Sequence, residues 1–361
     1  MRTLVVSDLH LGSRSEADVL RDPVARDTLL AELAAADRLV ILGDALELRH
    51  GPVTHALEAA HDTFAALGEA LGGGKEVALV AGNHDHAIVA PWMERRAIAR
   101  HPSLGLEQDA DPEDYEVAGV LARWLKPART RLAYPGLWLR DDVYATHGHY
   151  LDRHVTVPTF ERLAAGGMAK VIRDLPADDA TPEDYEAMLA PLYAWLHVVS
   201  RYTRVGFERQ KGTQNAWRLL TDSGPRPLRD RALVAAFPMA IRLLNAAGIG
   251  PLGPDLSAVE LRRAGLTAMA EAVRRLRIDA EWVLFGHTHR AGPLEGDDAS
   301  EWELPGGPKL VNTGCWVHEE VFLGRGGRRS PYWPGTVVEV GDEGPPRLRN
   351  LLEEWEPAVA A

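Results

Sequence analysis

The strongest constraint on the fold is a repeated pattern of short apolar runs, each followed at once by a polar motif. The first three runs are Thr3–Ser7, Arg38–Leu42 and Glu76–Ala81, and helical patterns over Ala17–Ala36 and Val53–Leu71 separate them. Runs this apolar predict strands buried on both faces of a sheet. Strand, helix, strand, helix, strand is typical of an α/β domain with parallel strands.

Later parts of the chain predict more strands. These are Arg131–Leu139, Asp142–Thr146, Trp282–Phe285, Lys309–Val311 and Thr336–Val340. Because Gly and Pro turns separate the later strands closely, we expect antiparallel pairing among them. The acidic stretch Pro102–Glu116 predicts a surface loop. The whole pattern predicts an α/β fold with two mixed sheets packed face to face and helices outside.

Residues 151–280 differ from the rest because long helical patterns dominate them. The predicted helices are Pro158–Asp174, Pro182–Arg204, Thr213–Thr221, Arg229–Ala247 and Ser257–Arg277. We therefore divide the chain into a core, residues 1–150 and 281–361, and a large helical insertion, residues 151–280, that forms a cap or lid. The insertion carries 18 Lys and Arg against 15 Asp and Glu, so the excess acid of the chain lies in the core.

Composition argues against several functional classes. The net charge of −12 is unfavourable for holding a nucleic-acid backbone, so no nucleic-acid partner is expected. The single cysteine, Cys315, cannot form an intrachain disulfide, which fits a reducing compartment. The chain enters its first strand at Thr3 and leaves no room for a signal peptide, so we expect a cytoplasmic protein. No stretch is apolar enough to predict a membrane span.

Two features of the insertion bear on its partners. Between Ser200 and Arg231 eight basic residues stand against three acidic ones. Such a run suits an anionic substrate, and it equally suits a solvated helix face paired with nearby acids. The apolar stretch Ala232–Leu252 fits core packing of the insertion or a lipid-facing patch. We expect a small-molecule or lipid-linked phosphate substrate and leave peripheral membrane contact through residues 200–252 as an alternative.

Five polar motifs follow the apolar runs. They are Asp8-Leu9-His10, Gly43-Asp44, Gly82-Asn83-His84-Asp85, His147-Gly148-His149 and Gly286-His287-Thr288-His289. Loops at the carboxyl ends of strands in one sheet can converge on a single point. Oxygen and nitrogen ligands without thiolate suit divalent Mn, Fe, Co, Ni or Zn. Two such ions about 3.5–4 Å apart are a known device for hydrolysing phosphate esters.

Taken singly, the first motifs also have structural explanations. Asp8 could cap a helix, and Asp44 could either cap or bridge two cations with one oxygen for each. We interpret Glu47 as the partner of Asp44 in a capping box. Asn83 offers a carbonyl ligand that adds no charge, which leaves His84 to face substrate.

The remaining motifs carry imidazoles. Asp85 can hydrogen-bond the neighbouring His84 and fix its tautomer. Two histidines follow each of two strands, and alternate residues on an extended segment share a face. A single ligand, His147, would suffice from its loop, so the role of His149 stays open.

Together and in this order, the motifs resemble the calcineurin-like metallophosphoesterases, whose pattern is D-x-H, GD, GNH(D/E), a later H and GHxH. The resemblance implies a four-layer α/β/β/α sandwich. It implies one metal held by Asp8, His10, Asp44 and His289, and a second held by Asp44, Asn83, His147 and His287. His84 would be the catalytic histidine and Asp85 its orienting partner. Manganese is the expected metal, with iron, zinc, cobalt and nickel as alternatives.

A looser similarity concerns the bacterial UDP-diacylglucosamine pyrophosphatases, which carry a helical lid after the third motif. The stretch Gly43-Asp44-Ala45-Leu46-Glu47 and the insertion after His147 carry this similarity. Those enzymes usually have arginine where this chain has His84 and aspartate where it has His149, so the substrate is not assigned.

These motifs lead us to expect a metal-dependent phosphoesterase that hydrolyses a phosphate ester or pyrophosphate bond. The expected mechanism is attack by a metal-bound hydroxide, with His84 assisting the leaving group. One alternative is a nuclease of the repair-phosphoesterase type, against which the acidic balance argues. The other is a non-catalytic adaptor that keeps the fold, but such relatives usually lack ligands and none is missing here.

Overall fold

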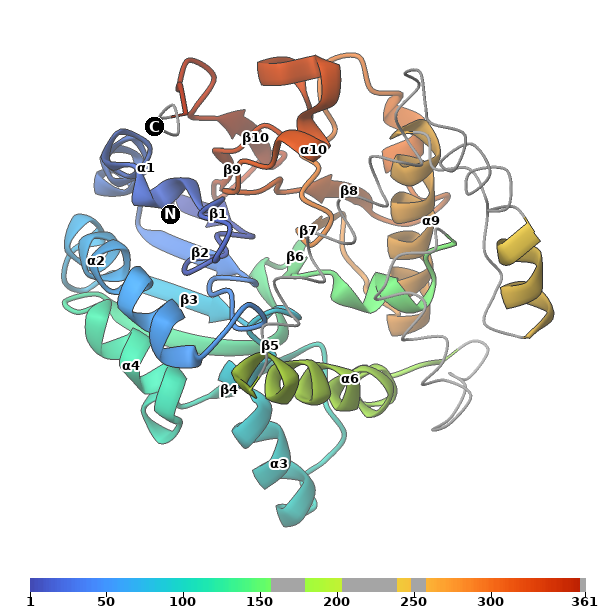
Figure 1. Cartoon of the computed structure of the whole chain (residues 1–361), viewed down its shortest axis with the longest axis horizontal. Coiled ribbons are helices and arrows are strands. Elements are labelled where there is room, and N and C mark those ends of the chain that lie inside the picture. Colours follow the sequence, from blue (N-terminus) through green and yellow to red (C-terminus); the bar gives the residue numbers. More distant parts are fainter. Residues whose placement is uncertain (157–178, 203–238, 248–257, 358–361) are drawn as a thin grey trace.

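The fold was analysed in a computed structural model of the chain. The structure describes residues 1–156, 179–202, 239–247 and 258–357 (Figure 1). The helices predicted over residues 158–174 and 213–221, most of the basic run and most of residues 232–252 lie outside these ranges, except that residues 239–246 are helical. None of the helices in the described ranges is both long and apolar enough to cross a membrane.

The strands form one mixed sheet in the order β10-β9-β1-β2-β3-β5-β6-β7-β8, with β4 paired to β5. Their bounds are β1 Thr3–Val6, β2 Arg38–Leu42, β3 Glu76–Val80, β4 Glu107–Ala110, β5 Arg129–Arg140, β6 Val143–Thr146, β7 Trp282–Phe285, β8 Lys309–Asn312, β9 Thr336–Val340 and β10 Arg347–Asn350. All the strands predicted from the sequence are present within one or two residues of the expected bounds.

Strand direction differs in part from the prediction. The strands β1, β2, β3 and β5 run parallel, as expected. The pairs β5–β6, β1–β9 and β9–β10 are antiparallel. However, β6, β7 and β8 are mutually parallel, so the prediction of antiparallel pairing is wrong for them. Parallel neighbours need long crossover connections, and the segments between these strands are long enough to provide them.

The long strand β5 explains why the sheet is continuous. Its first part, Arg129–Ala133, pairs with β3, and its last part, Gly136–Arg140, pairs with β6. We expected two separate mixed sheets packed face to face. The hydrogen bonding instead gives a single sheet that curves back on itself, because one twelve-residue strand belongs to both halves.

The inner core lies between the two halves of this sheet. Val5 and Val40 of one half share an apolar cluster with Leu284 and Val311 of the other. These side chains are almost completely buried. Since successive residues of a strand point to opposite faces, the alternate residues of each half are left to face helices outside.

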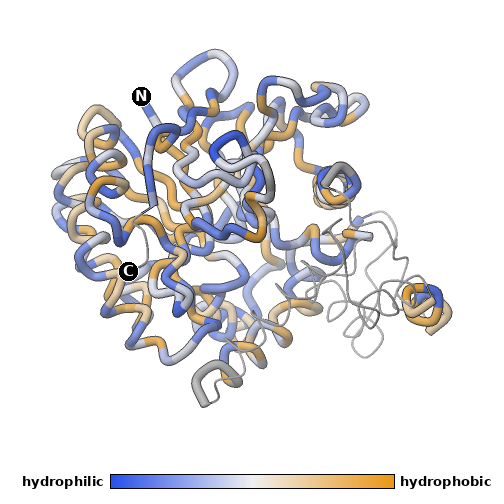
Figure 2. The backbone as a smooth tube through the Cα atoms, turned by 45° about the horizontal axis from the view of Figure 1, so that its top comes forward, coloured by the Kyte–Doolittle hydropathy of each residue, from blue (hydrophilic) through white to orange (hydrophobic). Residues whose placement is uncertain are grey.

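Helices cover both outer faces. Their bounds are α1 Pro23–Ala34, α2 Val53–Leu71, α3 Ala90–Ala99, α4 Glu116–Trp124, α6 Pro182–Tyr202, α9 Ala258–Leu276 and α10 Glu320–Leu323. Short 3₁₀ helices are η1 Val19–Arg21, η2 His86–Ile88, η3 Pro112–Asp114, η4 His149–Arg153, η5 Ala299–Trp302 and η6 Gly324–Arg329. Figure 1 shows α1, α2 and α4 on the side of β1–β3 and α9 on the side of β7 and β8. In Figure 2 orange and blue stretches alternate along these helices, as expected for helices with one buried face.

Local sequence explains where two of the helices begin and end. The helix expected over Ala17–Ala36 begins only at Pro23, because the Asp22 side chain accepts a hydrogen bond from the Val24 backbone and proline suits the first helical position. The helix α2 ends at Leu71, where Gly72 takes a φ of 85°.

The acidic stretch that we expected to be a surface loop contains the strand β4. Its side chains Glu107 and Asp109 both form ion pairs with Arg131 of β5. Charged side chains of this kind are common on edge strands. The alternation of acids therefore indicated a paired edge strand rather than a loop.

Besides the short helix at residues 239–246, the range that we assigned to the insertion includes two described helices with different surroundings. The helix α9 packs on the outer face of β6–β8, where Ala268 and Met269 share a cluster with Val283 and Phe285. The helix α6 instead packs against η2 and against Tyr150, beside the polar motifs.

Candidate metal centre

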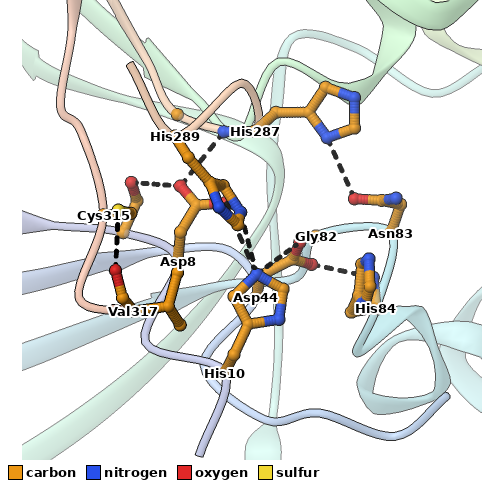
Figure 3. A network of polar contacts seen from close by, with 12 residues as sticks. Asp8, His10, Asp44, Gly82, Asn83, His84, His287, His289, Cys315 and Val317 are labelled. Carbon is orange, nitrogen blue, oxygen red and sulfur yellow. Dashed lines mark hydrogen bonds and ion pairs between the residues drawn. The ribbon is translucent and has the colours of Figure 1, made fainter. Parts of the chain in front are cut away.

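Five loops at strand ends bring the predicted ligands together (Figure 3). The loops after β1 and β2 run side by side and are joined by backbone hydrogen bonds. The Asp8 N–H donates to the Gly43 carbonyl at 3.1 Å, and the His10 N–H donates to the Asp44 carbonyl at 2.8 Å. The three ligands that these two loops carry, Asp8, His10 and Asp44, therefore sit on a fixed backbone.

The backbone at these loops takes an unusual conformation. Within the described residues, eight non-glycine residues have positive φ, and five of them belong to the predicted ligand set. They are Asp8, His10, Asp44, His287 and His289. A left-handed conformation costs a non-glycine residue on the order of 1 kcal/mol or more. Such strain concentrates where side-chain direction matters, and here it aims ligands inward.

Two motif glycines give the ligands room. Gly43 has a φ of 86°, and a Cβ atom there would lie 2.3 Å from Nδ1 of His147. A Cβ atom at Gly82 would lie 2.2 Å from Oδ1 of Asp44. Both distances are far inside van der Waals contact, so the spacing of the ligands requires glycine at these positions.

The first group of ligand atoms comes from Asp8, His10 and His289. The Nε2 atoms of the two histidines lie 3.1 Å apart, and Nε2 of His289 lies 3.3 Å from Oδ1 of Asp8. The other oxygen of Asp8 accepts hydrogen bonds from the Ser7 hydroxyl and the His287 N–H. One carboxylate oxygen is thus held by protein donors while the other faces the imidazoles.

The second group comes from Asp44, His147 and His287. Oδ1 of Asn83 lies 3.2 Å from Nε2 of His147 and 3.1 Å from Nδ1 of His287. The Nδ1–H of His147 donates to the Leu42 carbonyl at 2.9 Å. In the neutral ring this bond places the hydrogen on Nδ1 and leaves the Nε2 lone pair toward Asp44 and Asn83.

Asp44 connects the two groups through one atom. Its Oδ2 lies 3.7 Å from Nε2 of His10 and 3.2 Å from Nε2 of His147. Its Oδ1 accepts the backbone N–H of His84 at 2.8 Å. We expected each oxygen to face one cation, but a single oxygen faces both groups because the backbone amide occupies the other.

The donor atoms fit a pair of divalent cations. Oδ1 of Asp8 is buried and makes no hydrogen bond within the described residues. Oδ1 of Asn83 faces Nε2 of His147 and Nδ1 of His287, and both nitrogens must be unprotonated to bind a cation. The opposite amide orientation would let Asn83 donate to these atoms, so a cation is what would hold its oxygen inward. Carboxylate, amide and imidazole donors without thiolate match such ions.

The electrostatics of the cluster favour positive charge at its centre. Burial lowers the pKa of His10, but its bond to Glu47 and the charge of Asp44 outweigh this effect and raise the pKa to about 10. Burial likewise opposes protonation of His147, yet Asp44 raises its pKa to about 9. In the metal-free protein the buried carboxylates thus stabilise protons on imidazole nitrogens that would otherwise bind cations.

His84 lies at the open side of the cluster. Its side chain is 23% exposed, whereas that of His147 is fully buried. Its Nδ1 lies 2.7 Å from Oε2 of Glu47, which also lies 3.2 Å from Nδ1 of His10. Burial and the charge of Arg49 lower the pKa of His84 to about 4, so its imidazole is neutral in this state.

Asp85 does not orient His84 as we expected. Its carboxylate accepts hydrogen bonds from the backbone N–H groups of Gly82 at 2.7 Å, Ala45 at 2.8 Å and Leu46 at 3.3 Å. It therefore ties the Asp44 loop to the Asn83 loop. Burial and the nearby Asp44 charge raise the pKa of Asp85 to about 6. The position of imidazole partner belongs to Glu47, which we interpreted as a capping residue.

Sequence reasoning missed a second carboxylate. Asp152 follows the His147 loop on η4, and its Oδ1 lies 2.8 Å from Nε2 of His287. Its position just after the third motif, among ordinary insertion residues, gave no signal. The role of Glu47 could have been predicted, because it follows Asp44 by three residues and because His10 and His84 each need a hydrogen-bond partner for Nδ1.

His149 is buried beside the cluster rather than in it. Its ring centroid lies 5.6 Å from that of His147, and its Nε2 lies 3.4 Å from the Tyr134 hydroxyl. Its Nδ1 makes no hydrogen bond within the described residues. Burial and the neighbouring His147 hold the pKa of His149 well below its usual value.

The helix α6 reaches this region through polar contacts. Glu186 lies 3.0 Å from Nε2 of His86 and accepts hydrogen bonds from the hydroxyls of Tyr134 and Tyr150. Tyr193, two helical turns further along α6, lies under the guanidinium of Arg49, whose carbon is 5.3 Å from the ring centroid. The helix is therefore anchored next to the loop that carries Asn83 and His84.

Comparison with known families agrees with this geometry. The calcineurin-like phosphoesterase model matches residues 1–291, a range that contains every residue of the two ligand groups. No curated protein sequence matches the chain. Because the family model matches most of the chain and the motifs occur in the family's order, this chain belongs to the calcineurin-like phosphoesterase family.

Proposed function

We propose that the protein is a hydrolase that uses two divalent cations to cleave a phosphate ester or pyrophosphate bond. The observation that carries the proposal is the position of Oδ2 of Asp44 between two groups of ligand atoms. Membership of a family that consists generally of dinuclear metal hydrolases supports it. The substrate that we favour is a small-molecule or lipid-linked phosphate.

The ligand scheme follows the two groups. One cation would be held by Asp8, His10, Asp44 and His289, and the other by Asp44, Asn83, His147 and His287. When bound, such cations withdraw charge from phosphate oxygens and make a nearby water more acidic. Manganese is our first choice of metal, although the nitrogen and oxygen donors would also accept iron, zinc, cobalt or nickel.

Arg49 supplies a fixed positive charge beside this centre. Both of its terminal nitrogens lie 3.1 Å from the outer atom of the Asn83 amide. With the Asn83 oxygen facing the cluster, the amide N–H₂ group and the guanidinium stand next to each other. A phosphate oxygen placed beside them would accept hydrogen bonds from both, and arginine is well suited to phosphate.

His84 would act on the leaving group. Its bond to Glu47 orients the ring, and its partial exposure places it where substrate enters. With a pKa of about 4 it carries no proton to donate before substrate binds. The negative charge of a bound phosphate would raise that pKa, so proton donation would be coupled to binding of the substrate.

The proposal is tested by turnover with a matched pair of variants. We expect the manganese-loaded protein to hydrolyse p-nitrophenyl phosphate or bis-p-nitrophenyl phosphate, and chelator to abolish the activity. Asp44→Asn should lose most of the activity together with bound metal. Asp142→Asn should lose neither, because Asp142 pairs with Arg140 at the surface.

One outcome would refute the proposal, and a second would refute its small-molecule or lipid-linked substrate. Metal bound at full stoichiometry without turnover of any phosphate or pyrophosphate substrate would favour the adaptor. Salt-dependent binding and cleavage of DNA would favour the nuclease, against which the charge of −12 argues.

A further inference from the structure

The histidines of the cluster do not all present the same nitrogen. His10, His147 and His289 each turn Nε2 toward the neighbouring ligand atoms. His287 instead turns Nδ1 toward Oδ1 of Asn83 at 3.1 Å. For a neutral ring to bind a cation through Nδ1, its hydrogen must be on Nε2.

Asp152 occupies the position that can set this tautomer. Its Oδ1 lies 2.8 Å from Nε2 of His287, and the residue is only 5% exposed. An ionised carboxylate only accepts hydrogen bonds, so it selects the ring form that carries hydrogen on Nε2. The backbone fixes the other end, because the His287 N–H donates to Asp8.

Apolar packing holds Asp152 in place. Its neighbours Leu151 and Val155 lie in the same cluster as Phe285, which stands two residues before His287. The Leu151 N–H also bonds the Gly148 carbonyl within the third motif. Asp152 is thus positioned by the two loops that supply His147 and His287, although it lies at the start of the insertion range.

We propose that Asp152 is a positioning residue that makes His287 a ligand through Nδ1 and thereby completes the second cation site. This inference rests on the proposed function, since it assumes that two cations bind. Carboxylate partners of ligand histidines typically change metal affinity by about 10–100-fold when removed. The first group, Asp8, His10 and His289, makes no contact with Asp152 and should be unaffected.

The test compares Asp152→Asn with wild type and with the surface control Asp142→Asn. In titrations with Mn²⁺, we expect the variant to bind the first ion with wild-type affinity and the second about 10–100-fold more weakly. The first ion serves as an internal control for folding. The electron paramagnetic resonance spectrum should change from that of a coupled pair to that of isolated Mn²⁺ at concentrations that fill both wild-type sites.

A second readout reports the tautomer directly. In zinc-loaded protein with ¹⁵N-labelled histidine, wild type should show His287 with hydrogen on Nε2 and metal on Nδ1, and the variant should lose this signature. If each ion binds the variant as tightly as it binds wild type and the tautomer of His287 is unchanged, the inference about Asp152 is overturned while the proposed function stands. A wild-type protein that binds fewer than two ions would overturn the proposed function and this inference with it.

Discussion

Metal binding should release protons, and the number follows from the buried carboxylates. The metal-free protein holds His10 at a pKa of about 10 and His147 at about 9. At pH 7.5 both rings are therefore protonated, and each must lose its proton to become a ligand. We expect about two protons to be released when both sites fill. Two ordinary histidines with pKa 6.5 would release only about 0.2.

The assay is calorimetric titration of Mn²⁺ at pH 7.5 in buffers of different ionisation enthalpy, which counts the released protons. His10→Gln should remove about one of them, because one buried imidazolium is gone. His61→Gln should change nothing, because that side chain is exposed and contacts Asp62 and Trp124 rather than the ligand groups. A total well below one proton in wild type would refute the reasoning that the carboxylates charge these rings.

The same pKa values fix the direction of two pH effects. Metal affinity should rise with pH by about tenfold per released proton per pH unit until pH 9–10 is reached. The stability of the metal-free protein should change in the opposite sense. A raised histidine pKa stabilises the fold fully below pH 6.5, and this contribution is lost as pH rises through 9–10. Denaturant unfolding in chelator should show the free energy of unfolding falling as pH rises from 6.5 to 10.

Three substitutions test other parts of the site. His84→Ala should keep both ions but lower turnover of alkyl phosphates about 10²–10⁴-fold, with a smaller loss for nitrophenyl esters, and equal losses for both would contradict its role at the leaving group. Glu47→Gln should give part of the same effect in steady-state kinetics, since it weakens the bond that orients the ring. Gly82→Ala should reduce metal content because its Cβ would lie 2.2 Å from Oδ1 of Asp44, whereas the control Gly73→Ala meets no atom closer than 3.9 Å; equal metal content in both variants would show that the close approach is not required.

The parallel half of the sheet was predictable because its signals are local. Apolar runs of five residues between helical patterns define β1, β2 and β3, and the ligand motifs follow them directly. The gathering of Asp8, Asn83 and His287 could be expected from the order of motifs and from the geometry of strand ends. None of these predictions needed knowledge of the loops between them.

The errors come from features that depend on distant parts of the chain. Whether β5 separates two sheets or joins them depends on both of its partners, and its own sequence shows neither. The parallel direction of β7 and β8 depends on where the crossover segments run. Asp85 is adjacent to His84 in sequence, whereas Glu47 is 37 residues away and reaches the ring only because the loops after β2 and β3 lie side by side.

The strand β5 has a consequence for how ions enter and leave. Ligands such as Asp44 and His147 come from opposite halves of the sheet, and the single strand β5 pairs with β3 of one half and β6 of the other. Within the part of the chain that the structure describes, this shared strand ties the two halves together. We expect exchange of a cation to proceed by local rearrangement at the rim, where His84 and His289 are the most exposed of the motif histidines. Amide hydrogen exchange should accordingly slow in these rim loops on metal loading while β5 stays equally protected with and without metal.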